Sequence, residues 1–395
     1  MDYSKVCYLP FHGLTIDPSG HLTFCCMDYP SLPGGHKTSD RWFPTQHIDD
    51  IEDIELWWKT NYKQVWEDYT SKKDITNIRP CWSCFKGTNR TKNSTVQESY
   101  QRNLEIGKIN WEFNPNNPKI KFLEFTASNI CNQMCVMCNS RYSTQWYDYM
   151  PIFNKRHIYD SKVVKLSDSA VEKIKKLVPQ LSNVMIKGGE PLSDMKNLEL
   201  LEYLGEVNPQ CNVTMTTNFQ GLTQRHINIF KKIKNPEILV SLDGTNEIFN
   251  WIRGGDFNRV DENIKKFFLE TGQKVQITVT TSIYNFFNTN RIFEHFSGRE
   301  EIKWYQHHNI VSWPKWCDVR NLPEDIFEDQ MVKNLEIGAR YSKKCQFDKY
   351  FHMTVNPYNP EIIEAMKNYT LKMNLIRGFD ITDYVPELRA ILQAT

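Results

Sequence analysis

The chain has 395 residues, 40% of them hydrophobic, and a formal charge of +1. This length suffices for one large domain with one or two smaller units. The balanced charge does not indicate a general polyanion-binding surface, so nucleic acid is not an expected partner. No stretch approaches the roughly 20 apolar residues of a membrane span, and the opening MDYSKVCYLPFHG has no long apolar run. We therefore expect a cytoplasmic protein with no membrane partner.

Cysteine is the most informative residue type. The chain has eleven, and eight of them fall within the first 138 residues. In a reducing cytosol, such clustering is more typical of metal or redox chemistry than of disulfides. A simple buried thiol explains Cys211, which stands alone in a strand-like run, but it does not explain the CxxxCxxC and CxxC spacings.

Residues 1–112 are predicted to form a small α+β domain. Leu14–Ile16 and Leu22–Phe24 alternate apolar and polar residues around Asp17–Gly20, whose sequence Asp-Pro-Ser-Gly favours a turn, so we expect a β-hairpin. Two prolines and three asparagines at 114–118 then indicate a linker.

Residues 113–320 are predicted to form a partial (β/α)6 TIM-like barrel, because six strand candidates alternate with helical segments. The expected strands are Phe122–Phe125, Val184–Ile186, Val213–Thr216, Ile238–Ser241, Val275–Val279 and Ile302–Tyr305. The expected helices are Ser169–Leu181, with Ser169 and Glu172 as a capping box, and residues 195–206, 222–234, 257–270 and 287–296. Residues 321–395 are expected to be a helical C-terminal extension, so the fold class is α/β.

The first strand leads directly into Cys131, Cys135 and Cys138. Three thiolates within eight residues can hold three irons of a cubane cluster. The fourth iron then has no protein ligand and can chelate a small molecule. A structural zinc site would instead need a fourth ligand with matching spacing.

At this CxxxCxxC loop the chain resembles the radical S-adenosylmethionine (SAM) superfamily. The resemblance implies a [4Fe–4S] cluster on Cys131, Cys135 and Cys138, with SAM bound at the open iron. It further implies reductive cleavage of SAM to a 5′-deoxyadenosyl radical, which takes a hydrogen atom from substrate. The family usually has an aromatic residue before the third cysteine, whereas this chain has Met137, which can pack against adenine.

Later motifs agree with this resemblance in order and position. Gly188, Gly189 and Glu190, followed by a proline, match the GGEP motif that holds the amino group of SAM. Two glycines allow close approach of a ligand, and the carboxylate can accept hydrogen bonds from an ammonium group.

Four polar residues beyond the GGEP motif resemble family positions that contact SAM. Asn218 follows the third strand, and Ser241 and Asp243 lie at the end of the fourth. Arg253 resembles an arginine that can pair with the methionine carboxylate. Strand-end capping and a solvated arginine are the plainer explanations.

Cys7, Cys25, Cys81 and Cys84 can converge on a second metal site, because the hairpin bridges the first pair and CxxC supplies the second. Four thiolates suit either Zn²⁺ or a fully ligated [4Fe–4S] cluster. The hairpin, the Cys-Cys pair and the CxxC resemble a twitch domain, the half-sized relative of the SPASM domain, which implies an auxiliary [4Fe–4S] cluster. That domain usually follows the barrel, and here it precedes it. We favour Cys25 over Cys26 as the ligand.

These features predict a radical SAM oxidoreductase that acts on a peptide, protein side chain or small polar molecule. A fully ligated auxiliary cluster would accept an electron, which favours a net oxidation, dehydrogenation or crosslink, and a reductase such as flavodoxin or ferredoxin would donate one. His307 and His308 could move a proton, and Cys317 or Cys345 could donate a hydrogen atom. The alternative is a non-catalytic zinc or iron–sulfur module that binds nucleic acid.

Overall fold

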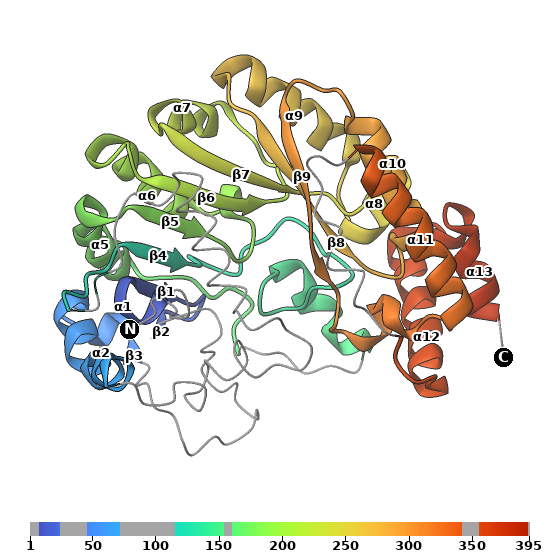
Figure 1. Cartoon of the computed structure of the whole chain (residues 1–395), viewed down its shortest axis with the longest axis horizontal. Coiled ribbons are helices and arrows are strands. Elements are labelled where there is room, and N and C mark those ends of the chain that lie inside the picture. The colour runs from blue at the N-terminus through green and yellow to red at the C-terminus, as the bar shows by residue number, and fades with distance from the viewer. Residues whose placement is uncertain are drawn as a thin grey trace. The chain divides into compact units, whose positions relative to one another are not determined.

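The computed structural model describes residues 8–23, 46–71, 114, 116–153, 160–341 and 355–393. Figure 1 labels the helices and strands of the chain. The chain divides into two compact units. The first unit comprises Met1–Ile130, Ile158–Met215 and Asn228–Pro236. The second unit comprises Cys131–His157, Thr216–Ile227 and Glu237–Thr395. These units do not follow the segments 1–112, 113–320 and 321–395, which stay a prediction.

The sheet of the first unit has the strand order β3-β2-β1-β4-β5-β6. Its strands are β1 (Gly13–Ile16), β2 (His21–Thr23), β3 (Gln46–His47), β4 (Phe122–Phe125), β5 (Asn183–Ile186) and β6 (Asn212–Thr217), which continues into the second unit. Both pairings of β2 are antiparallel, whereas β1, β4, β5 and β6 run parallel to one another.

The predicted hairpin is confirmed. Asp17 Oδ1 accepts hydrogen bonds from the backbone N–H groups of Ser19 at 2.9 Å and His21 at 3.0 Å, which closes the turn between β1 and β2. In addition, β1 pairs in parallel with β4 from Gly13↔Phe122 onward. The hairpin therefore extends the same sheet as the first predicted barrel strand.

Two helices of the first unit cover the start of this hairpin. They are α1 (Leu9–His12) and α2 (Ile54–Thr70), and Asp53 caps α2 with a side chain that accepts a hydrogen bond from Leu56 N. Trp58 Nε1 donates to Gly13 O at 3.1 Å and Trp66 Nε1 donates to Pro10 O at 2.6 Å. The tryptophans of α2 thus combine apolar burial with satisfied N–H groups.

The predicted capping box at Ser169 was wrong. Helix α5 (Asp168–Leu177) is capped by Ser167, which has an extended backbone and accepts the hydrogen bond of Ala170 N. Ser169 lies inside the helix. The last predicted turn is a separate 3₁₀ segment, Val178–Gln180, because its proline interrupts the α-helical hydrogen bonding. Helix α6 (Met195–Val207) follows β5 as expected.

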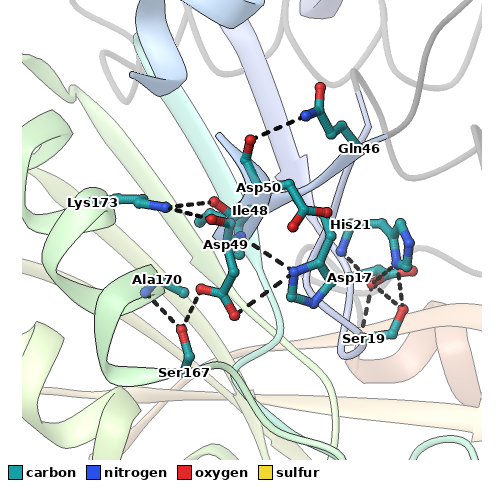
Figure 2. Close-up of polar contacts among 11 residues, drawn as sticks. Asp17, Ser19, His21, Gln46, Ile48, Asp49, Asp50, Ser167, Ala170 and Lys173 are labelled. Carbon is teal, nitrogen blue, oxygen red and sulfur yellow. Dashed lines mark hydrogen bonds and ion pairs between the residues drawn. The ribbon is translucent and has the colours of Figure 1, made fainter. Parts of the chain in front are cut away.

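The short 3₁₀ segment η2 (Ile48–Asp50) is held against α5, as Figure 2 shows. Lys173 Nζ donates to Ile48 O at 2.9 Å and to Asp49 O at 3.1 Å. The Ser167 hydroxyl also contacts Asp49 Oδ1. The choice of Ser167 as the cap is therefore supported by a residue 118 positions away.

The second unit contains the parallel strands β8 (Val275–Thr281) and β9 (Ile302–Ile310), together with β7 (Asn235–Ser241), whose first two residues belong to the first unit. Its remaining helices are α8 (Asn246–Arg253), α9 (Phe257–Thr271), α10 (Thr289–Phe296), α11 (Glu324–Tyr341), α12 (Pro360–Arg377) and α13 (Pro386–Gln393), while α7 (Gln224–Lys232) passes from this unit into the first. The C-terminal extension is helical, as predicted, and Gly378 ends α12 in the left-handed conformation.

The chain is an α/β protein with a mostly parallel sheet, as predicted. Among the described strands, β3 and β9 each pair with one neighbour only, so the sheet does not close, which agrees with a partial barrel. All six predicted barrel strands are present, whereas α8 was not predicted. Within the described ranges, the helices are too short or too polar to cross a bilayer.

Candidate functional site

The three motif cysteines lie on one loop of the second unit. Cys131 is buried, while Cys135 and Cys138 are half-buried free thiols. The backbone folds tightly at the second pair, since Cys138 N donates to Cys135 O at 2.9 Å. Gln133 N also lies 3.4 Å from Cys131 Sγ. These contacts fold the motif into a compact loop.

Side chains of the following segment, which includes the 3₁₀ stretch η4 (Thr144–Phe153), accompany this loop. Ser143 Oγ donates to Gln133 O at 2.6 Å and Trp146 Nε1 donates to Cys135 O at 2.9 Å. Both bonds are made to main-chain carbonyls. The loop shape thus depends on neighbours other than the cysteines.

Val136, between the second and third cysteines, is held by α8 and α12. Its N–H donates to Ile252 O at 2.8 Å, and its carbonyl accepts the Tyr369 hydroxyl at 2.6 Å. Val136 is 0% exposed, so both polar groups are satisfied by protein rather than by water.

Arg377, the last residue of α12, connects the loop with α8. Its guanidinium donates to Met134 O in the loop and, at 2.8 Å, to Trp251 O in α8. Burial is the main reason why the pKa of Arg377 lies below its usual value. Tyr369 and Arg377 were missed by the sequence analysis, since no spacing pattern links them to the cysteines.

Asn218 contacts the cysteine loop from the end of β6. Its Nδ2 donates to Asn132 Oδ1 at 2.6 Å, and its Oδ1 accepts Gln220 N at 3.0 Å. Gln220 in turn accepts a hydrogen bond from Gln133 Nε2 at 2.8 Å. Two loop residues of the CxxxCxxC motif are therefore held by polar side chains at this strand end.

Asp243 and Arg253 form a buried ion pair. Arg253 Nε lies 2.7 Å from Asp243 Oδ2, and Arg253 Nη1 lies 3.6 Å from Cys135 Sγ. Although burial opposes the charged form, Asp243 and Cys135 raise the pKa of Arg253 above its usual value. The predicted contacts Ser241, buried at the end of β7, and Met137, half-buried in the loop, belong to the same unit.

The loop thiols lie in surroundings that disfavour a bare thiolate. Burial raises the pKa of Cys135, and Arg253 opposes this shift. Burial, reinforced by Cys135, raises the pKa of Cys138 to about 12. A coordinated metal would oppose this shift, because it deprotonates its thiol ligands.

The GGEP motif lies in the first unit, after β5. Gly188 has φ +89°, and a Cβ there would lie 1.7 Å from Thr126 Cγ2. A Cβ on Gly189 would lie 2.1 Å from Ile130 O. Glu190 N donates to Ile130 O at 2.6 Å, and its buried carboxylate accepts Leu192 N at 3.0 Å. The turn therefore requires both glycines and fixes the glutamate side chain.

Several predicted residues fall outside the described part of the structure. They are Cys7, Cys25, Cys26, Cys81, Cys84 and Cys345, together with the side chains of His307 and His308. Cys317 is described and is buried at the end of the 3₁₀ turn Lys315–Cys317.

Over the described ranges, no three His, Cys, Asp or Glu side chains gather closely enough to hold a single metal ion. A cubane cluster has no such requirement, because each thiolate binds a different iron. Three cysteines on one braced loop therefore suit a cluster with one open iron.

Residues 125–294 match the family model described as Radical SAM superfamily. The matched region is less than half of the 395 residues, and it contains the cysteine loop, the GGEP motif and the polar residues at the ends of β6 and β7. No curated protein matches the chain.

Among solved structures, the chain is similar to native anSMEcpe with bound AdoMet, at 18% identity and a TM-score of 0.41, with 58% of this chain and 65% of that chain covered. Streptococcus suis SuiB bound to S-adenosylmethionine has 14% identity and a TM-score of 0.41, with 72% and 60% covered. This chain thus spans 60–65% of the length of these two proteins. The family match over residues 125–294 identifies a radical SAM superfamily domain in this chain.

Proposed function

We propose that this protein is a radical SAM enzyme whose Cys131, Cys135 and Cys138 hold a [4Fe–4S] cluster. The observation that carries the proposal is the cysteine loop itself. Its carbonyl groups are bound by side chains of η4 and α12 and its half-buried thiols are free, within a region that matches the superfamily. When bound, the cluster would supply one electron to cleave SAM into methionine and a 5′-deoxyadenosyl radical.

The residues of this chain would bind and orient the nucleotide. Glu190 offers a fixed carboxylate to an ammonium group, and Gly188 and Gly189 allow the tight turn that holds it. Ser241 offers a hydroxyl at a strand end, and Met137 an apolar surface for adenine. Asn218 would act partly through the loop, because its amide already binds Asn132.

We further propose an auxiliary [4Fe–4S] cluster on Cys7, Cys25, Cys81 and Cys84. With four thiolate ligands it would take an electron from the substrate radical, which gives a net oxidation of a peptide, protein or small polar substrate. Support comes from the spacing of these cysteines alone. A flavodoxin- or ferredoxin-like reductase would supply the first electron.

Anaerobic reconstitution with iron and sulfide tests both parts. We expect about eight irons per chain for two cubanes and about four if only the radical SAM cluster forms. With SAM and dithionite, the reconstituted protein should release 5′-deoxyadenosine. A protein that assembles a cluster but releases none is not a radical SAM enzyme, whatever else it binds.

The decisive variant is Cys135→Ala, which should abolish 5′-deoxyadenosine release. Cys211→Ala is the matched control, because Cys211 is a buried cysteine in the first unit, outside every motif. Equal loss in both variants would show a general effect on folding instead. Cys84→Ala should spare SAM cleavage but stop turnover; full turnover would exclude the electron-transfer role of the auxiliary cluster.

A further inference from the structure

Arg253 is the last residue of α8 and directs its guanidinium at a loop cysteine. Nη1 lies 3.6 Å from Cys135 Sγ, and Nε lies 2.7 Å from Asp243 Oδ2. The Arg253 side chain is 12% exposed and that of Asp243 is 0% exposed. A single buried guanidinium thus connects a carboxylate with a cysteine sulfur.

Asp243 is held so that one oxygen stays directed at Arg253. Its Oδ1 accepts Thr280 N at 2.8 Å, and its main-chain carbonyl accepts Asn285 Nδ2 at 2.9 Å. The remaining carboxylate oxygen, Oδ2, faces Arg253. A bidentate clasp of the guanidinium is therefore not formed, and Nη1 remains available to the sulfur.

The end of α8 is fixed as well. Gly254 adopts the left-handed conformation at φ +67°, and a Cβ there would lie 2.6 Å from Arg377 Nη1. Arg377 Nε also donates to Trp251 O at 2.8 Å. The backbone that carries Arg253 is thus braced on its C-terminal side, which limits how far the guanidinium can swing from Cys135.

Hydrogen bonds to cluster sulfurs and nearby positive charge favour the reduced, more negative state, and they raise the reduction potential. Arginine stays charged when buried and has enough N–H groups to serve two partners. We propose that Arg253, positioned by Asp243, donates to the Cys135 thiolate and raises the potential of the cluster, instead of binding the carboxylate of SAM. This inference rests on the proposed function.

The test is the midpoint potential of the SAM-free, reconstituted protein, measured by redox titration with EPR detection. Arg253→Lys keeps the charge but offers a compact ammonium that cannot bridge both partners, so its potential should fall below that of the wild type. Its affinity for SAM, measured by isothermal titration calorimetry, should stay within about threefold of the wild type.

Arg299→Lys is the matched control. Its side chain is 16% exposed and its guanidinium contacts the carboxylates of Asp261 and Glu301 in the same unit. The potential of this variant should equal that of the wild type. The double variant D243N/R253Q avoids an unpaired buried charge at Asp243, and its potential should also fall.

An unchanged midpoint potential in both Arg253 variants would overturn the proposal. If the affinity for SAM is also weakened, Arg253 contributes to SAM binding instead. If neither Arg253 variant assembles a cluster while Arg299→Lys does, Arg253 is required for cluster assembly. That result would also overturn the proposal that it tunes the potential. A wild-type protein without a cluster would instead defeat the proposed function, on which this inference depends.

Discussion

The cysteine loop and the GGEP turn are both short motifs, but different forces hold them. The loop is held by side chains that reach its carbonyls, such as Tyr369 on Val136 and Trp146 on Cys135. The GGEP turn is held by the bond from Glu190 N to Ile130 O and by the Glu190 carboxylate, and its two glycines leave no room for a side chain. The cysteine loop therefore depends on side chains that bond to it, whereas the GGEP turn depends on the absence of a Cβ atom at both glycines.

This difference decides how each motif responds to mutation. In a tightly packed turn, even one added methyl group forces backbone atoms to move, and the fold loses stability. A loop bound by several side chains loses one hydrogen bond at a time, at about 1 kcal/mol each. Among the predictions below, Gly189→Ala and Tyr369→Phe test this contrast.

Gly189→Ala should have the largest effect. Its methyl group would lie 2.1 Å from Ile130 O, a backbone atom that cannot turn away, so we expect a loss of about 4 kcal/mol or more in the free energy of unfolding. Gly205→Ala is the milder comparison, since its methyl group would lie 3.0 Å from Lys232 Cβ, a looser contact than the one at Gly189. Anaerobic chemical denaturation measures both; a cost below about 1 kcal/mol for Gly189→Ala would refute the contrast.

A pH titration tests the hydrogen bonds of a buried histidine, His12, in the first unit. Buried His12 bonds Lys119 O through Nδ1 at 3.0 Å and accepts Asn114 N at Nε2 at 3.2 Å. Burial is the main reason why its pKa falls from 6.5 to about 4. The unfolded chain therefore binds the proton more readily, and the stabilisation present above pH 6.5 is lost as the pH falls towards 4, by about 3 kcal/mol.

His12→Gln should flatten this dependence, because glutamine does not titrate. The measurement is the free energy of unfolding between pH 4 and 7, with the wild type in parallel. An equally steep decline in the variant would assign the effect to other groups.

Tyr369→Phe should cost about 1–2 kcal/mol, because it leaves the buried Val136 carbonyl without its hydroxyl partner. It should also speed the loss of iron from the reconstituted protein. Tyr284→Phe is the matched control. It removes a buried hydroxyl that lies 2.9 Å from the hydroxyl of Thr370, a neighbour of Tyr369 in α12. Iron release, followed with a chelator, should rise only in Tyr369→Phe; an equal rise in both would mean that α12 stabilises the unit without a specific role at the loop.

Ser167→Ala should have the smallest measurable effect, about 1 kcal/mol, since it removes the cap of α5. Ser169→Ala should change stability by less than about 0.5 kcal/mol. Thermal unfolding of the two variants compares them directly. A larger loss from Ser169→Ala would restore the capping box predicted from sequence.

Local patterns predicted the strands, the hairpin and the positions of the motifs, because alternation and turn residues act over a few positions. The choice between Ser167 and Ser169 was not predictable, since it depends on Asp49, which contacts Ser167 across 118 positions. The contact of Tyr369 with Val136 spans 233 positions and follows no motif. Sequence thus showed which residues could carry the chemistry, but not which residues hold them in place.

The pairing of β1 with β4 has a consequence for how the chain folds. Gly13 and Phe122 are 109 positions apart, so this parallel pair closes a long loop at an entropic cost that grows slowly with loop length. During synthesis, β1 must wait for Phe122–Phe125 before it gains its parallel neighbour in the sheet. A break in β4 would therefore leave β1 without its parallel neighbour.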